Sequence, residues 1–344
     1  MQKLRIAIVG VNFGRWIVRN DFNTPGTAAR DAFDLVAVCD RDAARAQESA
    51  DLVGVEALTD LDTLLERDDI DAIGLFTAPA GRAALLQKII RAGKHVMTTK
   101  PFETDSQAAL EVLREARRLG RVIHLNSPGP LPTADICQIL EWQQSLGAPV
   151  GCRAETWVSY REKANGTWLD DPELCPVAPL YRLGIYLFND LVRLFGTPER
   201  AQVMHSRLFT GRPTPDNALA GIAFANGLLA NVYASFCVND GQHYTDSLTI
   251  NYERGTIYRN VGRDAFSGGK RQLVLVRENH RESREFTEHS GSYQWKHFAE
   301  AIRLGGPLPG EIGPEAIVAG LDLINALARA EKSGGTETIG HTGV

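Results

Sequence analysis

The sequence has few cysteines, and none of them has the spacing of a metal site or a redox motif. Five cysteines are scattered over 344 residues without a C-x-x-C pair. An odd number of scattered cysteines is typical of reduced thiols rather than of a disulfide framework. The eight histidines also lack H-x-x-x-H or a similar ligand spacing, so we expect no metal site.

An excess of positive charge and long hydrophobic runs are missing as well. The formal net charge is −5, which argues against a broad nucleic-acid-binding surface. No apolar run approaches the roughly 18–20 residues of a membrane span. The apolar run after Met1 has the length of a strand and leads directly into a glycine turn, unlike a secretory signal peptide. We therefore expect a cytoplasmic protein that binds neither nucleic acid nor a membrane.

Two different patterns of strands and helices are present. Over residues 1–125, short apolar segments alternate with amphipathic helical segments, as in a doubly wound parallel sheet. Beyond a proline-rich break, residues 126–344 contain segments of alternating apolar and polar residues, and Asn226-Gly227 predicts a hairpin. We therefore predict an α/β protein, with an N-terminal Rossmann domain over 1–125 and an α+β domain with a large, mainly antiparallel sheet over 126–344.

Hydrophobic periodicity and capping residues define the expected elements. In the first domain the expected strands are 4–9, 35–40, 73–77, 95–98 and 122–125, and the expected helices are 42–52, 61–65, 82–92 and 105–119. In the second domain the expected helices are 134–146, 179–195 and 314–332, and the expected strands are 152–160, 201–208, 219–224, 228–236 and 247–252.

The first strand is followed by a turn that carries two glycines. The turn, residues 10–14, reads G-V-N-F-G, and a helical stretch starts near Arg15. Such a strand, turn and helix start can cradle the pyrophosphate of a dinucleotide, because free backbone N–H groups and the helix dipole favour an anion. The G-x-G-x-x-G spacing would put Arg15 at the third glycine. We therefore interpret the turn as one residue shorter, with Gly14 as the third glycine and Asn12, which tolerates left-handed φ/ψ, as the second. The predicted cofactor-binding residues of the turn are Gly10, Asn12, Phe13 and Gly14; an ordinary strand-to-helix turn is the alternative.

The second strand ends on a carboxylate, Asp40, which Arg41 follows. An acid at this position can accept hydrogen bonds from a ribose 2′-OH and would repel a 2′-phosphate, whereas Arg41 could pair with that phosphate. We predict NAD as the cofactor, with NADP as the alternative. Thr77, at the end of the strand 73–77, completes the predicted cofactor-binding residues together with Lys100.

Three segments in this order resemble the Gfo/Idh/MocA oxidoreductase family over essentially the whole chain. They are the glycine turn, the run from Ala92-Gly93-Lys94-His95-Val96 into Lys100-Pro101, and the run from Asp171-Pro172-Glu173-Leu174 into Leu183-Gly184-Ile185-Tyr186. The resemblance implies a Rossmann domain followed by a domain with an open sheet that often forms a dimer interface, so we expect a homodimer or homotetramer. It also implies hydride transfer between a nicotinamide and a carbinol carbon of a small-molecule substrate, commonly a sugar or cyclic polyol.

The resemblance implies two catalytic residues. Lys100 matches the lysine of the family's Glu-Lys-Pro motif, and Tyr186 resembles the catalytic tyrosine of the branch with Gly-Ile-Tyr. A tyrosine with a pKa of about 10 is ionised to roughly one part in a thousand at pH 7, and a nearby ammonium can lower that pKa by about 1–3 units. A Lys–Tyr pair is therefore a credible acid/base unit. A solvated strand-end lysine and a core aromatic are the alternatives.

Several positions depart from the family pattern. Thr99 stands in place of the motif's glutamate, Arg82 in place of a histidine, and Arg182 in place of an aspartate that assists catalysis. Arg182 would share a helix face with Tyr186, where it could favour the phenolate or bind an acidic substrate. The predicted substrate-binding residues are Arg182, Asn189 and Trp168.

These departures leave two other functions open. One is a cofactor-binding regulatory or interaction protein that kept the fold and lost turnover. The other is a non-redox enzyme that uses bound NAD transiently, as some family glycosidases and lyases do.

Overall fold

Contacts within the computed structural model divide the chain into two units. The structure describes residues 2–159, 162–240, 244–261 and 270–343. The first unit comprises Met1–Pro130 and Tyr293–Pro314, and the second comprises Leu131–Ser292 and Glu315–Val344. The predicted division assigned all of 126–344 to the second domain. The structure differs from that division chiefly because a late segment of the chain returns to the first unit.

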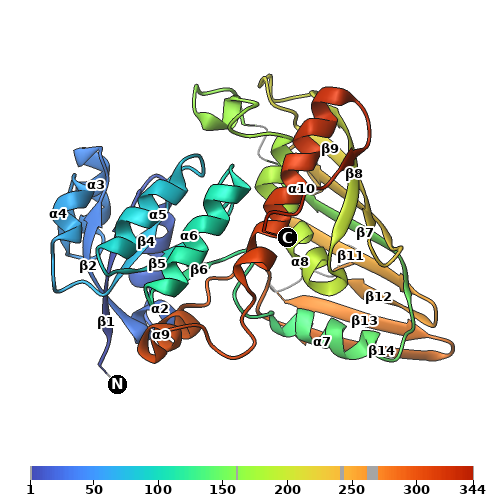
Figure 1. Cartoon of the computed structure of the whole chain (residues 1–344), viewed down its shortest axis with the longest axis horizontal. Coiled ribbons are helices and arrows are strands. Elements are labelled where there is room, and N and C mark those ends of the chain that lie inside the picture. The colour runs from blue at the N-terminus through green and yellow to red at the C-terminus, as the bar shows by residue number, and fades with distance from the viewer. Residues whose placement is uncertain (1, 160–161, 241–243, 262–269, 344) are drawn as a thin grey trace. The chain divides into compact units, whose positions relative to one another are not determined.

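The first unit is built on a parallel sheet. Within the described residues, six strands lie in the order β3-β2-β1-β4-β5-β6, with every neighbouring pair parallel (Figure 1). The strands are β1 (Leu4–Val9), β2 (Phe33–Cys39), β3 (Glu56–Leu58), β4 (Ala72–Leu75), β5 (His95–Thr98) and β6 (Ile123–Leu125). The predicted Rossmann sheet is therefore confirmed. The strand order places β2 and β3 on one side of β1 and β4 to β6 on the other, so the topological switch point lies between β1 and β4. Sheets of this kind bind ligands at that point, beyond the carboxyl ends of their strands.

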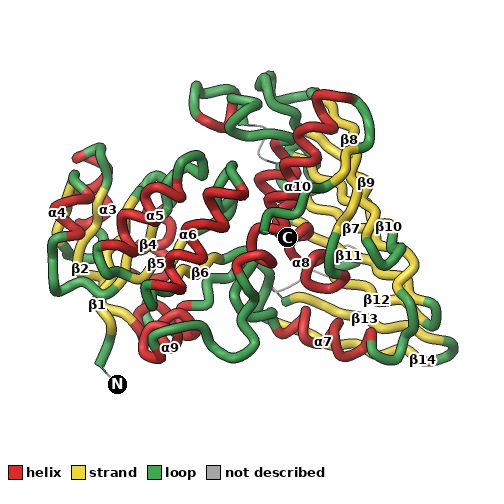
Figure 2. The backbone as a smooth tube through the Cα atoms, viewed as in Figure 1, coloured by secondary structure: helices red, strands yellow, loops and turns green. Residues whose placement is uncertain are grey.

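Helices connect the strands of this sheet (Figure 2). They are α1 (Gly14–Ile17), α2 (Ala28–Ala32), α3 (Ala43–Asp51), α4 (Leu61–Leu65), α5 (Arg82–Arg91) and α6 (Ser106–Arg118), with a π-helical segment (Val18–Phe22) after α1. Asp42, Asp60 and Asp105 each accept two backbone N–H bonds at the start of α3, α4 and α6. These caps satisfy N–H groups that have no partner within the helix, which is why the predicted starts agree with the structure.

His95 is a buried residue of β5. The Val122 N–H donates to its Nδ1 at 3.1 Å, and its Nε2 lies 3.3 Å from Arg121 Nη1. Burial, reinforced by the charge of Arg121, lowers the pKa of His95 to about 4. The imidazole of the folded protein is therefore neutral at pH 7, and it accepts the Val122 N–H rather than serving as a proton donor.

Acidification is expected to destabilise the first unit through His95. The pKa is 6.5 for an ordinary imidazole and about 4 in the folded protein, so the unfolded chain binds more protons between these values. The free energy of unfolding is therefore unaffected by this group above pH 6.5 and decreases as the pH falls below that value. At pH 5 the decrease is about 2 kcal/mol. Urea unfolding at pH 7 and pH 5 measures the loss. His95→Asn keeps an acceptor for Val122 without a titrating group, and an equally steep pH dependence in that variant would contradict the assignment.

The returning segment carries α9 (Trp295–Leu304), which the sequence patterns miss. The Trp295 ring lies 5.4 Å from that of Phe22 and 5.9 Å from that of Phe33, between centroids, and the Phe298 ring lies 5.5 Å from that of Phe33. Trp295 Nε1 also donates to Asp21 Oδ2 at 2.8 Å. Burial of large aromatic surfaces with the indole N–H satisfied is strongly stabilising, and it explains why this segment belongs to the first unit.

The second unit is built on a large mixed sheet. Among the described residues, nine strands lie in the order β14-β13-β12-β11-β7-β10-β9-β8-β15, with β10 and β7 parallel and the other pairs antiparallel (Figure 1). The strands are β7 (Pro149–Trp157), β8 (Pro198–Ser206), β9 (Asn217–Phe224), β10 (Leu229–Ser235), β11 (Thr245–Tyr252), β12 (Gly255–Arg259), β13 (Arg271–Arg277), β14 (His280–Phe286) and β15 (Glu337–Thr338). The predicted mainly antiparallel sheet and the hairpin at Asn226-Gly227 are confirmed.

The predicted strands correspond to β7 to β11, and the patterns miss β12 to β15. The strand predicted for 152–160 ends earlier, at Trp157 of β7, and residue 160 lies outside the described residues. The pattern in β9 alternates strictly between half-buried and buried residues, as expected for a sheet with one covered face.

Helices cover one face of this sheet (Figure 1). They are α7 (Ala134–Gln143), α8 (Ile185–Phe195) and α10 (Pro314–Ser333). Ala154, Val232 and Leu248 are at most 1% exposed and lie in register on neighbouring strands, where they pack in one core with residues of α8 and α10. The helix predicted for 179–195 is not regular, because its first turn is a π-helical segment (Leu180–Gly184). No helix in the described part of the chain combines the length and the apolar character needed to cross a membrane.

Candidate functional site

The glycine turn of the first unit follows β1 directly. Gly10 has a φ of +84°, and a Cβ built on it would lie 3.0 Å from the backbone carbon and oxygen of Phe76. The Gly14 N–H donates to the Gly10 carbonyl at 3.1 Å. A side chain at residue 10 is therefore disfavoured by both conformation and space, and the turn stays narrow between β1 and α1.

Gly14 occupies the other close approach. A Cβ built on it would lie 3.2 Å from Ile8 Cγ2 and 3.4 Å from Phe76 Cδ2, so this glycine lets the helix pack on the strand. Arg15 instead reaches away, and its Nη1 lies 2.8 Å from Glu48 Oε2. The shorter turn proposed from the sequence therefore matches the packing. Asn12 does not take its expected left-handed conformation, because residues 11–13 already form helical turns that lead into α1.

Asp40 is tied to the same turn. Its Oδ2 accepts the Val11 N–H at 2.8 Å, and its Oδ1 accepts the Asp42 N–H at 3.0 Å and Arg45 Nη2 at 3.2 Å. The side chain is only 9% exposed, whereas Arg41 is exposed. The carboxylate therefore holds the turn against the end of β2, a role that sequence reasoning missed.

Thr77 lies beside Gly10, with its Cγ2 3.1 Å from a Cβ built on the glycine. Its Oγ1 is buried, and no group in the described ranges forms a hydrogen bond with it. A buried hydroxyl without a partner calls for an explanation such as a ligand. Its place beside the tight glycine turn fits a bound dinucleotide. The exposed ring of Phe13 completes this surface and stacks on Trp16 at 6.2 Å between centroids.

Lys100 stands on a loop that a buried arginine holds. The Lys100 N–H donates to Asn126 Oδ1 at 2.8 Å. Arg82, which is 1% exposed, donates to the carbonyls of Thr99 at 2.6 Å and Phe102 at 3.0 Å, and also to those of Pro101 and Thr77. The guanidinium thus binds the loop after β5 through the residues on both sides of Lys100, and it joins this loop to the loop after β4 through Thr77.

Glu103 completes this arrangement. It is 2% exposed and accepts the N–H groups of Gly81 at 3.1 Å and Ala83 at 2.7 Å, so it caps α5 from another loop. Thr99 Oγ1 accepts the Tyr293 hydroxyl at 2.9 Å. The unusual residues Thr99 and Arg82 therefore both take part in the hydrogen bonds of this region, and neither disrupts the loop that carries Lys100.

Tyr186 lies in the second unit, at the start of α8. Its half-buried ring contacts Gly291, because a Cβ built on Gly291 would lie 2.6 Å from the ring carbon Cε1. The preceding π-helical segment contains Arg182. The regular helical spacing assumed from the sequence therefore does not hold between Arg182 and Tyr186, since a π-helical turn contains more residues than an α-helical one.

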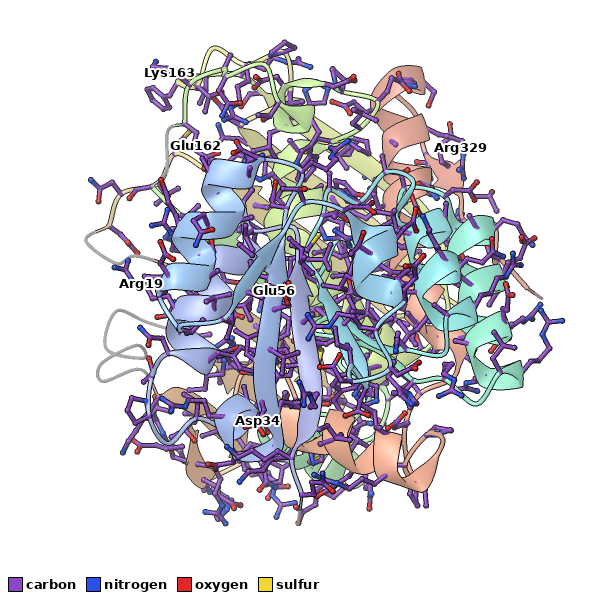
Figure 3. All side chains as sticks on the ribbon, turned by 90° about the vertical axis from the view of Figure 1, so that its left-hand side faces the viewer. Arg19, Asp34, Glu56, Glu162, Lys163 and Arg329 are labelled. Atoms are coloured by element: carbon purple, nitrogen blue, oxygen red, sulfur yellow. The ribbon has the colours of Figure 1, made fainter. Side chains whose placement is uncertain are left out.

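Arg182 is paired within the second unit. Its Nη1 lies 2.9 Å from Glu162 Oε2, and its guanidinium carbon lies 4.5 Å from the centre of the Phe236 ring. Figure 3 shows Glu162 and Lys163 on one loop, whose carbonyls accept bonds from the buried Arg212 at 3.2 and 3.0 Å. The charge of Arg182 is thus shared with a carboxylate and an aromatic face.

The two other predicted substrate residues have structural contacts. Asn189 is 6% exposed, and a Cβ built on Gly320 of α10 would lie 2.1 Å from its Oδ1, so its amide lies at the contact of α8 with α10. Trp168 begins a short 3₁₀ helix (Trp168–Asp170) and packs on the core of the second unit. Their contact with a substrate stays a prediction.

Sequence reasoning noted Arg82 only as a departure from the family pattern and missed its role, and it missed Glu103 and Asp190. Asp190 is 7% exposed, and burial raises its pKa although the charge of Arg259 opposes this. A carboxylate within the apolar run of α8 could have been recognised from the sequence, whereas the partners of Arg82 come from loops that only the fold brings together.

Across residues 2–159, 162–240, 244–261 and 270–343, no group of three or more His, Cys, Asp or Glu side chains is arranged to hold a metal ion.

Two family descriptions match this chain. Residues 4–127 match an oxidoreductase family with an NAD-binding Rossmann fold, and residues 138–258 match the GFO/IDH/MocA C-terminal domain. The chain belongs to the Gfo/Idh/MocA oxidoreductase family. The resemblance inferred from its motifs is thereby confirmed over both units.

Several relatives of this Gfo/Idh/MocA protein have names that describe activity on sugars. Galactose 1-dehydrogenase from Pseudomonas fluorescens is 38% identical over 117 residues, 33% of this chain and 35% of the relative. A dTDP-3,4-didehydro-2,6-dideoxy-alpha-D-glucose 3-reductase from Actinomadura kijaniata is 31% identical over 178 residues, 48% of this chain and 52% of the relative. The chain thus spans between a third and about half of the length of these relatives.

Solved structures share the fold over the whole length. Levoglucosan dehydrogenase in complex with NADH superposes with a TM-score of 0.77 at 15% identity and covers 99% of this chain and 100% of that one. A putative NADPH-dependent oxidoreductase from Desulfitobacterium hafniense has a TM-score of 0.81 at 15% identity and covers 98% of each chain. Identities this low establish the fold alone.

Proposed function

We propose that this protein is an NAD(P)-dependent oxidoreductase that transfers a hydride between a nicotinamide and a carbinol carbon of a sugar, polyol or related ring compound. The observation that carries the proposal is the turn at Gly10, where a side chain would meet the backbone of Phe76 at 3.0 Å. The first glycine of a dinucleotide-binding turn permits this tight connection between strand and helix, and the free N–H groups at the helix start can then bind the pyrophosphate. The sugar-related names of the dehydrogenase and reductase relatives support the substrate class.

Each residue has a defined part in this proposal. A bound nicotinamide would supply the hydride acceptor or donor. Lys100 and Tyr186 are the proposed catalytic residues, and Tyr186 takes the hydroxyl proton of the substrate. The residues proposed to hold the cofactor are Gly10, Asn12, Phe13, Gly14, Asp40, Arg41, Thr77 and Lys100.

NAD is the proposed cofactor, with NADP as the alternative. The Asp40 carboxylate stands at the end of β2, where it would repel a 2′-phosphate. Its bonds with Val11, Asp42 and Arg45 keep it in place. The exposed Arg41 is the residue through which NADP could bind instead.

Calorimetric titration with NAD(H) and, separately, NADP(H) tests the proposal. Micromolar binding of one form is expected, followed by turnover of at least one member of a panel of aldoses, anhydrosugars and cyclic polyols. Binding of neither form would overturn the proposal. Binding without hydride transfer would favour the alternative, a cofactor-binding regulatory or interaction protein, which rests on the departures at Thr99 and Arg182. Deuterium exchange at the carbinol carbon without net oxidation would instead indicate a non-redox reaction.

Arg182 is expected to favour a carboxylated substrate. Its side chain is 15% exposed and its guanidinium bonds to Glu162. A substrate acid could replace this carboxylate, since such charge-assisted bonds are directional and strong. With NAD(H) present, Arg182→Ala should weaken binding of galacturonate by at least about tenfold and that of galactose by less than about twofold. Glu162→Gln should strengthen galacturonate binding. Calorimetric titrations measure both, and equal losses for the two sugars would contradict the role.

The exposed face of the large sheet is the proposed interface of a homodimer. Met204, Leu219 and Tyr233 are paired across β8, β9 and β10 and so share one face. Met204 is 68% exposed and Leu229 is 64% exposed, and exposed apolar residues on one face mark interaction sites. A variant with both Met204→Lys and Leu229→Lys should be a monomer, rather than a dimer, in sedimentation velocity. Leu304→Lys changes an equally exposed leucine of α9 and should not, and a monomeric wild type would contradict the proposal.

A further inference from the structure

A short segment of the second unit packs against the ring of Tyr186. Gly291 has a φ of +100°, and a Cβ built on it would lie 2.6 Å from Tyr186 Cε1 and 3.2 Å from both Cδ1 and Cζ. Only a glycine allows this approach without a shift of the ring, because a Cβ would collide with Cε1 and press tightly against Cδ1 and Cζ. The contact covers the part of the ring that carries the phenol oxygen.

A hydrogen bond fixes the segment that carries Gly291. The Ser290 hydroxyl lies 2.8 Å from both carboxylate oxygens of Asp190. Within the segment, the Ser292 N–H donates to the His289 carbonyl at 3.0 Å. Asp190 is four residues after Tyr186 on α8, so both side chains leave the same side of the helix. One helix therefore presents both the tyrosine and the anchor of the segment that contacts it.

Asp190 is itself held by a buried charge cluster, which we define as Asp135, Asp190, Asp246, Arg259 and Arg271. Arg259 is fully buried, and its Nη1 lies 2.7 Å from Asp190 Oδ2 and 3.2 Å from Asp135 Oδ2. Arg271 bonds to both oxygens of Asp246, at 2.9 and 2.7 Å. These charges come from α7, α8 and three strands of the sheet, so the anchor for Ser290 is fixed to the core of the second unit.

We propose that Ser290 and Gly291 are positioning residues for Tyr186, which hold its ring in the orientation that its proton transfer requires. The inference rests on the proposed function of Tyr186 and adds the elements that orient it. A half-buried tyrosine near a helix start has more than one accessible rotamer. The Gly291 contact restricts the ring, and the Ser290–Asp190 bond keeps Gly291 in place.

Kinetics of matched variants test the positioning role. Gly291→Ala should lower kcat by about 10- to 100-fold with little change in the KM for the sugar or in NAD affinity. Ser290→Ala should lower kcat less, and Ser290→Thr, which keeps the hydroxyl, should restore it. Gly227→Ala is the control for backbone strain alone, because Gly227 has a φ of +85° with no atom within 4 Å of its Cβ position. In a Tyr186→Phe background, Gly291→Ala should cause no further loss of kcat.

The ring itself can be followed without turnover. In protein labelled with 3-fluorotyrosine, the ¹⁹F resonance missing in Tyr186→Phe belongs to Tyr186. It should shift in Gly291→Ala and Ser290→Ala and stay in place in Gly227→Ala. A normal kcat in Gly291→Ala, with kcat lowered in Tyr186→Phe, would overturn this inference alone. An unchanged kcat in Tyr186→Phe would overturn the proposed role of the tyrosine, and the inference with it.

Discussion

Replacement of Tyr186 by phenylalanine is expected to lower kcat by about 10²- to 10⁴-fold without weakening cofactor binding. The change removes the hydroxyl that takes the proton and keeps the ring that packs against Gly291. The fold of α8 should therefore be unaffected. Steady-state kinetics at saturating cofactor, with the sugar or polyol that is turned over best, measure kcat, and calorimetric titration measures the affinity for the cofactor.

Tyr252→Phe is the matched control for this prediction. It also removes one phenol hydroxyl from the second unit, where that group donates to Gln143 Oε1 at 3.2 Å. Its kcat should stay within about twofold of the wild type. If Tyr186→Phe behaved like this control, the acid/base assignment would fail, and the regulatory alternative would gain support.

Local signals predicted most of the first unit, although they missed the short elements α2 and β3. The strand 4–9 coincides with β1, and the aspartates at 42, 60 and 105 mark the helix starts because a cap is decided by neighbouring residues. The returning helix α9 was missed. It has no side-chain cap at Gln294, and its place in the first unit depends on contacts of Trp295 and Phe298 with residues far away in the sequence.

The strands at both edges of the large sheet escaped prediction for a related reason. β14 reads H-R-E-S-R-E-F, and most of its residues are exposed. Charged residues are characteristic of edge strands, but they remove the alternation by which a strand is recognised. β15 has only two residues, Glu337 and Thr338, and is defined entirely by its pairing with β8.

The candidate site divides in the same way between local and distant signals. The roles of Gly10 and Gly14 were readable, since a turn between a strand and a helix is a local structure. The bond from the Val11 N–H to Asp40 and the four carbonyls bound by Arg82 were not readable. They join loops that follow different strands, and only the parallel sheet brings those loops together.

Arg259 illustrates how strongly the second unit depends on such distant contacts. It is fully buried within the buried charge cluster, which contains three carboxylates and two guanidinium groups. Burial opposes the charged form of Asp246, but the charges of Arg271 and Arg259 outweigh it and lower the pKa of Asp246 to about 2. The two arginines therefore keep buried carboxylates ionised that would otherwise be costly to bury.

Arg259→Met is expected to destabilise the second unit by about 3–5 kcal/mol, because it leaves Asp135, Asp190 and Asp246 without one of their two counter-charges. Urea unfolding at pH 7, followed for the transition of the second unit, measures the loss. Without Arg259, whose charge lowers the pKa of both Asp190 and Asp246, those two pKa values should rise in the folded state. Protonation then relieves the uncompensated charge, and the difference from the wild type should narrow as the pH falls towards 4.

The Arg259 prediction has a control and a rescue. Arg277→Met changes an exposed arginine of β13, whose Nη1 lies 3.4 Å from Ser145 Oγ, and should alter the unfolding free energy by no more than about 0.5 kcal/mol. Asp190→Asn added to Arg259→Met removes one of the uncompensated charges and keeps an acceptor for Ser290, so it should recover part of the lost stability. If the double variant were less stable than Arg259→Met, packing of the arginine side chain rather than its charge would account for the loss.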